Sequence, residues 1–79
     1  MSDTEKYKKI VIESLDFDEK LFKEELKYQE IEEWDSIGHM GLISALEDEF
    51  SITLDTEDIV SYDSYEKGIE ILKKYKVNI

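Results

Sequence analysis

The predicted fold is decided by the stretch from Trp34 to Phe50, which reads WDSIGHMGLISALEDEF. Its apolar side chains recur at the spacing that places residues along one face of an α-helix. Asp35 and Ser36 stand before this stripe, and both residue types cap helices well. We therefore predict a central helix over residues 36–50. Its inner stripe is Met40, Ile43, Ala45, Leu46 and Phe50, flanked by Ile37 and Leu42.

Three further helices are predicted around this one. A capping-box pattern, Ser2-x-x-Glu5, precedes an apolar stripe and predicts a first helix over residues 3–15. Residues 55–60, an acid-started segment, predict one short helix. A second capping-box pattern, Asp63-x-x-Glu66, predicts a final helix that runs through Tyr75 into a lysine-rich end.

The connection between the first two helices, residues 16–35, contains no glycine or proline but many large apolar side chains. A structureless loop of that length is uncommon in a compact domain, so we expect a short helical turn around residues 18–26. Trp34, just before the cap, is expected to staple the incoming chain to the start of the central helix. The fold class that follows is an all-α bundle of three long helices and one short helix.

Composition restricts the functions that are open to this chain. With 79 residues it supports one domain with a modest core, which leaves little room for a desolvated catalytic pocket, so we expect no enzyme. The formal net charge of −11 argues against binding to nucleic acid or anionic lipid. No apolar run suggests membrane insertion or secretion, which predicts a cytoplasmic monomer.

Metal chemistry and thiol chemistry are also restricted. The chain has no cysteine, so any thiol would have to come from a cofactor. Asp16-x-Asp18 begins like a calcium-binding EF-hand loop, but the central glycine is missing and Lys27 stands where that loop needs glutamate. We therefore expect no metal site.

The two Asp-Ser pairs of the chain, Asp35-Ser36 and Asp63-Ser64, each precede a predicted helix. Such a pair is most often a simple helix cap. Only Ser36 is followed by an aliphatic residue, a helix with an apolar inner face and a terminal cluster of acids. The segment that begins at Asp35-Ser36 resembles the signature of the acyl carrier protein family, in which Asp-Ser-Leu opens a helix that ends in an alanine, a leucine and an acidic run. Asp35-Ser36-Ile37 and the residues ALEDEF at 45–50 carry the resemblance, which extends more loosely over the whole chain.

The resemblance implies a single carrier domain over residues 1–79, with an acyl-carrier-like bundle and a long first loop. It implies that a separate phosphopantetheinyl transferase attaches phosphopantetheine, donated from coenzyme A, to Ser36. The thiol of this arm would carry acyl, aminoacyl or related groups as thioesters between a loading enzyme and a downstream acyltransferase or synthase. Asp35 would assist the transfer through the transferase's metal ion, or act only as a cap. Ile37 and His39 would flank the arm, with His39 near its phosphate or acting as a base.

The distribution of charge predicts a docking face. All 10 basic residues lie outside residues 28–66, which hold more than half of the 21 acidic residues. Such a face would attract basic partners in a way that salt weakens, although a solvated surface gives the same pattern. The residues expected to dock partners are Glu47, Asp48, Glu49, Glu57 and Asp58. Four others, expected in the core, are also candidates by resemblance to shelter the cargo: Met40, Ile43, Leu46 and Ile59.

The sequence also departs from the carriers of fatty acid synthesis. Those carriers usually have small residues before Asp-Ser and an acid five positions after the serine, where this chain has Glu33-Trp34 and Gly41. Gly38 and Gly41 lie on one side of the central helix, where each costs roughly 1 kcal/mol relative to alanine. One hypothesis is that they leave room for the arm or a partner, so that alanine at both positions stabilises the fold and slows loading. The alternative is that they are tolerated surface glycines.

A second function remains open from the sequence. The chain can also be a non-covalent interaction module, an acidic helical bundle that docks basic proteins and uses Asp35-Ser36 only as a helix cap.

Overall fold

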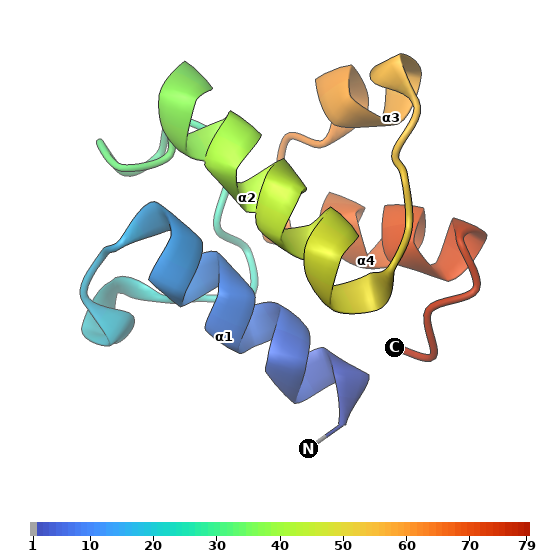
Figure 1. Ribbon diagram of the computed structural model, residues 1–79. Coiled ribbons are helices and arrows are strands. Elements are labelled where there is room, and N and C mark those ends of the chain that lie inside the picture. The colour runs from blue at the N-terminus through green and yellow to red at the C-terminus, as the bar shows by residue number, and fades with distance from the viewer. Residues whose placement is uncertain (1) are drawn as a thin grey trace.

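The computed structural model describes residues 2–79 and contains four α-helices (Figure 1). They are α1 (Asp3–Leu15), α2 (Ser36–Phe50), α3 (Thr56–Ser61) and α4 (Tyr65–Lys74). A short 3-10 turn, η1, spans Glu19–Leu21. Within the described range there is no strand, and the β pairing consists of one isolated bridge between Lys27 and Ser64. The predicted all-helical class is confirmed.

Side-chain caps explain where the long helices begin. The Ser2 hydroxyl accepts a hydrogen bond from the Glu5 amide at 3.2 Å, so the predicted start of α1 is confirmed. The predicted bounds of α2 are confirmed as well. The cap of α4 is Ser64, whose hydroxyl accepts from the Lys67 amide at 3.0 Å. The sequence-based assignment of that cap to Asp63 is therefore wrong by one residue.

The core lies where the four helices and the long connection meet. Helices α1 and α2 pack along each other, and α4 lies behind α2 in the view of Figure 1. The buried Tyr7 hydroxyl joins α1 to the C-terminal half of the chain, because it lies 2.7 Å from the Tyr62 hydroxyl and donates to the Tyr65 carbonyl at 2.7 Å. The largest fully buried side chains are Trp34, Tyr7, Leu26, Leu42, Ile43, Leu46, Leu72 and Val11.

The connection over residues 16–35 is packed but is mostly not helical. Only residues 19–21 form a helical turn, so the predicted turn over residues 18–26 is too long. The backbone finds partners around the distant start of α4 instead: the Tyr28 amide donates to the Asp63 carbonyl, and the amide of Tyr65, the first residue of α4, donates to the Leu26 carbonyl, each at 2.8 Å. These bonds satisfy backbone groups that a local helix would otherwise have to satisfy.

Two expectations about α2 are wrong. Met40 was expected in the core, but 55% of its surface is exposed, because it shares the solvent face of α2 with Ile37. Alanine at Gly38 was expected to stabilise the fold, but a Cβ there would overlap with the Glu33 carbonyl oxygen. Gly38 therefore makes room for the chain's own incoming loop. Gly41 differs, since a Cβ there meets nothing within 4 Å.

Within residues 2–79, no helix combines the length and the apolar character needed to cross a membrane.

Candidate functional site

The start of α2 exposes a serine hydroxyl that the helix cap does not use. Asp35 is the N-cap, and its Oδ1 accepts a hydrogen bond from the Gly38 amide at 2.8 Å. Ser36 is the first residue of the helix and is solvent-exposed. Because the amide groups of a first turn point outward with a partial positive charge, this position favours a bound anion next to the Ser36 hydroxyl.

The second Asp-Ser pair is arranged differently. At Asp63-Ser64 the serine itself is the cap, and its hydroxyl accepts the hydrogen bond from the Lys67 amide. Ser64 is also half-buried, whereas Ser36 is exposed. The structure thus separates two pairs that have the same residues: the Ser64 hydroxyl is used by the fold, and the Ser36 hydroxyl remains accessible.

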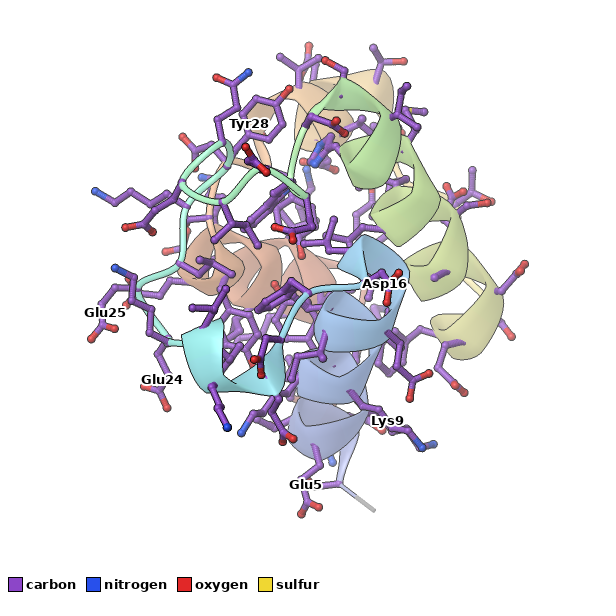
Figure 2. All side chains as sticks on the ribbon, turned by 90° about the vertical axis from the view of Figure 1, so that its left-hand side faces the viewer. Glu5, Lys9, Asp16, Glu24, Glu25 and Tyr28 are labelled. Carbon is purple, nitrogen blue, oxygen red and sulfur yellow. The ribbon has the colours of Figure 1, made fainter. Side chains whose placement is uncertain are left out.

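A tyrosine that the sequence analysis did not single out lies against Ser36. The Tyr28 hydroxyl is 3.2 Å from Ser36 Oγ, although eight residues separate the two in the chain. Figure 2 shows Tyr28 on the long connection, at the end of the molecule where α2 begins. No local sequence pattern predicts this contact, because it depends on how the connection folds back over α2.

His39 is held on both sides by the fold. The indole Nε1–H of Trp34 donates to His39 Nδ1 at 3.0 Å, and His39 Nε2 lies 2.9 Å from the carbonyl oxygen of Ile59 in α3. Since an indole nitrogen is only a donor, Nδ1 must be the acceptor and Nε2 must carry the proton that Ile59 accepts. Both ring nitrogens are therefore engaged, so a contact with the arm's phosphate or a role as a base would require His39 to give up one of these hydrogen bonds.

Both α2 and α3 carry exposed apolar side chains. Ile37 and Met40 lie one turn apart on the solvent face of α2, and Val60 lies on α3. Among residues 2–79, the exposed large hydrophobic residues are these three and Leu21 on η1, with 85% of Ile37 and 77% of Val60 accessible. Of these residues, Ile37 follows Ser36 directly and Met40 lies one helical turn further along α2, so both are on the same helix as the serine.

Three of the five acids expected to dock partners are exposed, and the other two are engaged by the fold. Asp48, Glu49 and Glu57 are exposed, so they remain available to a partner. Glu47 is half-buried, and its Oε2 accepts from the Leu54 amide at 2.8 Å, which fixes the connection between α2 and α3. Asp58 is buried, so the expectation that it docks partners is wrong.

Asp58 joins α3 to the end of α4. Lys74 Nζ lies 2.9 Å from Oδ1, and the Tyr75 hydroxyl donates to Oδ2 at 2.6 Å. The hydrogen bond from Tyr75, followed by the one from Lys74, holds the pKa of Asp58 below its ordinary value. This carboxylate is therefore part of the fold and not of a docking surface.

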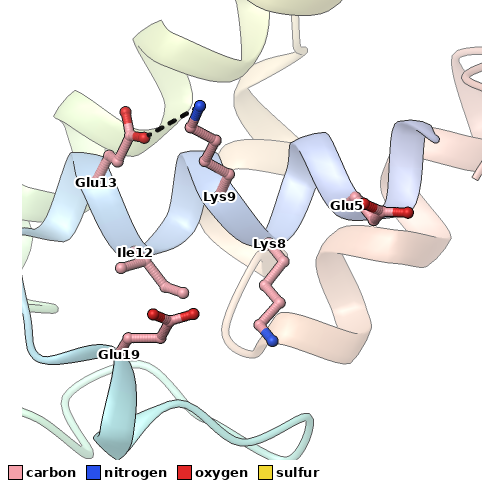
Figure 3. Close-up of a pocket in the computed structure, with 6 residues that line it drawn as sticks. All are labelled: Glu5, Lys8, Lys9, Ile12, Glu13 and Glu19. Carbon is pink, nitrogen blue, oxygen red and sulfur yellow. Dashed lines mark ion pairs between the residues drawn. The ribbon is translucent and has the colours of Figure 1, made fainter. Parts of the chain in front are cut away.

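The four residues expected to line a cargo site differ widely in burial. Ile43 and Leu46 are buried in the core, Ile59 is half-buried and Met40 is exposed. A hollow of about 450 Å³ lies instead between α1 and η1 (Figure 3). Its lining carries an exposed ion pair, Lys9 with Glu13 at 3.8 Å. Two smaller hollows lie beside α1, and their linings do not include Ser36.

Within residues 2–79, no group of three or more His, Asp or Glu side chains is arranged to hold a metal ion.

Comparisons of the chain with models of protein families, with curated proteins and with solved structures find no match.

Proposed function

We propose that this protein is an acyl carrier, with an acyl-carrier-like helical bundle, that bears a phosphopantetheine arm on Ser36. The observation that carries the proposal is that the helix cap and the exposed hydroxyl at the start of α2 belong to two different residues. Asp35 caps the helix, which leaves the Ser36 hydroxyl exposed beside the amides of the first turn. In the same chain, Ser64 is used as a cap. A serine that served only the fold would be expected to resemble Ser64.

The attachment step requires a nucleophilic hydroxyl and a site for the product's charge. Ser36 Oγ would form a bond to the phosphorus next to pantetheine while a P–O bond of coenzyme A's pyrophosphate breaks. The adenosine bisphosphate leaves with the bonding electrons, and the serine proton passes to a base of the transferase. The product is a phosphodiester anion, which the positive end of α2 stabilises. Asp35 keeps its capping bond through Oδ1, so its other oxygen is the one to meet a metal ion of the transferase.

The surface around Ser36 suits partners that are both basic and apolar. Ile37 and Met40 offer apolar contacts on the first turns of α2, and Val60 offers one on α3. Asp48 and Glu57 add exposed negative charge on the same two helices. A transferase, a loading enzyme and a downstream acyltransferase or synthase would each dock here while acyl, aminoacyl or related cargo is transferred. The carrier itself does no catalysis and works as a cytoplasmic monomer.

Mass spectrometry tests the attachment. The purified protein is incubated with coenzyme A and a promiscuous phosphopantetheinyl transferase, beside the Ser36→Ala, Ser64→Ala and Ser44→Ala variants. We expect the wild-type protein and both control variants to gain the mass of one phosphopantetheine, and Ser36→Ala to gain none. Ser44 is the matched control, since it is an exposed serine on the same helix. If the wild-type protein gains no mass, the carrier proposal is wrong and the non-covalent interaction module takes its place.

Charge reversal tests the docking surface. Lysine at Asp48 and Glu57 together should lower the loading rate and reduce its dependence on salt, because exposed charges act mainly on encounter. Lysine at Glu24 and Glu25 is the matched control with the same change in net charge, because both residues are exposed on the long connection and lie on the opposite side of the molecule from α2 in Figure 2. Equal effects of the two double variants would mean that only the total charge matters.

A further inference from the structure

We propose that Tyr28 is a positioning residue for the arm: its hydroxyl orients Ser36 before attachment and holds the phosphodiester afterwards. The inference rests on the proposed function of Ser36. It starts from the 3.2 Å separation between the Tyr28 hydroxyl and Ser36 Oγ, a contact between the long connection and the first residue of α2.

Several contacts hold the Tyr28 side chain in place. Its backbone amide donates to the Asp63 carbonyl at 2.8 Å, which fixes this part of the connection to the segment before α4. Its ring packs edge-on against His39, with ring centroids 5.4 Å apart, and against Trp34, with centroids 6.2 Å apart. Trp34 is fully buried. The Tyr28 hydroxyl is therefore presented by a rigid surface and not by a mobile loop tip.

The surface beneath Tyr28 is itself fixed by hydrogen bonds. Trp34 donates to His39, and His39 donates to the Ile59 carbonyl in α3. The chain's single tryptophan and single histidine thus support the ring of Tyr28. The side chains that support Tyr28 therefore also belong to the core and to the contact between α2 and α3.

The chemistry of the hydroxyl changes when the arm is attached. Before attachment, Ser36 and Tyr28 can each donate to the other. Afterwards Ser36 Oγ is an ester oxygen without a proton, so the Tyr28 O–H is left as the donor. The phosphodiester oxygens beside it are charged acceptors, which form stronger hydrogen bonds than neutral ones. Residues 28–66 contain no lysine or arginine, so a neutral donor such as Tyr28 is what this stretch can offer the phosphate.

The test compares Tyr28→Phe with Tyr75→Phe. The first variant removes the hydroxyl but keeps the ring that packs on Trp34 and His39. The second removes a tyrosine hydroxyl that hydrogen-bonds to Asp58 and serves as the matched control. Loading is measured as kcat and KM with one transferase, and the loaded proteins are compared by ³¹P NMR. For Tyr28→Phe we expect kcat to fall roughly threefold to tenfold with KM unchanged, and the phosphodiester resonance to shift. Tyr75→Phe should leave kcat and the resonance as in the wild type.

A second measurement needs no variant to load. In wild-type protein with ¹³C-labelled tyrosine, the Cζ resonance of Tyr28 should shift on loading while that of Tyr75 stays in place. If the wild-type protein is loaded but the Tyr28 resonance and the kcat of Tyr28→Phe are unchanged, the inference is overturned and the proposed function stands. A faster kcat for Tyr28→Phe also overturns it, because Tyr28 would then restrain Ser36. If the wild-type protein is not loaded at all, the proposed function fails and this inference fails with it.

Discussion

Alanine at Gly38 and alanine at Gly41 should change stability in opposite directions, although both substitutions are made on α2. Helix propensity favours alanine over glycine by about 1 kcal/mol at either position. At Gly41 nothing lies within 4 Å of the new Cβ, so the full gain should appear. At Gly38 the new Cβ would overlap with the Glu33 carbonyl oxygen and lie 3.2 Å from a methyl carbon of Leu15.

The overlap at Gly38 should outweigh the gain in propensity. Forcing extra atoms into a packed site typically costs about 1–3 kcal/mol, and here the obstacle is backbone, which cannot rotate away. A backbone obstacle places the cost in the upper part of that range, at about 2–3 kcal/mol. After subtraction of the propensity gain of about 1 kcal/mol, we expect Gly38→Ala to lower the free energy of unfolding by about 1–2 kcal/mol. In a domain of this size, each kcal/mol corresponds to a change in Tm of roughly 4–8 °C.

Thermal and urea unfolding followed by circular dichroism would measure both variants. Gly41→Ala should melt above the wild type and Gly38→Ala below it. A Gly38→Ala variant as stable as Gly41→Ala would refute the close approach of Glu33 to α2. Loading of Gly41→Ala then tests the remaining part of the sequence-based hypothesis, that this glycine leaves room for a partner. Slower loading would support that role, and unchanged loading would leave Gly41 as a tolerated surface glycine.

Two further predictions concern side chains that join elements. Asp58→Asn should be less stable than the wild type at neutral pH, because Tyr75 and Lys74 stabilise the charged carboxylate. Because the pKa of Asp58 is lowered in the folded state, this stabilisation is fully present above the carboxyl's ordinary pKa of 3.8 and is lost as the pH falls through the folded-state pKa. The difference in urea midpoint between the wild type and Asp58→Asn should therefore narrow in acid. A difference that does not change with pH would contradict the stabilisation of the Asp58 carboxylate by Tyr75 and Lys74. His39→Phe leaves Trp34 Nε1 and the Ile59 carbonyl without partners and should cost about 1–3 kcal/mol, with a shift in the emission of the single tryptophan. Unchanged emission would show that His39 does not contact the indole.

The helices could be predicted from the sequence because the signals that set them are local. Caps and apolar periodicity act within one or two turns, and the bounds of α1 and α2 agree with the predictions from those signals. The short helix was predicted over residues 55–60 and is observed over Thr56–Ser61, within the usual uncertainty of helix ends. The cap of α4 was misplaced because Asp63 and Ser64 are both good caps and are adjacent in the chain.

The remaining errors have a common physical cause, which is contact between distant segments. The turn predicted over residues 18–26 is shortened because Leu26 and Tyr28 make backbone hydrogen bonds with the first residue of α4 and with the segment just before it. Asp58 was assigned to the surface because its partners, Lys74 and Tyr75, follow much later in the chain. A run of acids gives the charge of a surface, but it does not show which member of the run has been turned inward.

The same limit explains why the sequence can mark Ser36 as a candidate but does not predict its surroundings. The motif that begins at Asp35 is local, so it can be recognised without a structure. Whether the aspartate or the serine of such a pair caps the helix depends on one hydrogen bond. In this chain the aspartate, Asp35, is the cap in the first pair, and the serine, Ser64, is the cap in the second. The contact with Tyr28 depends on the course of the whole connection. If the arm is attached at Ser36, the residues that control it should therefore be sought in this connection as well as in α2.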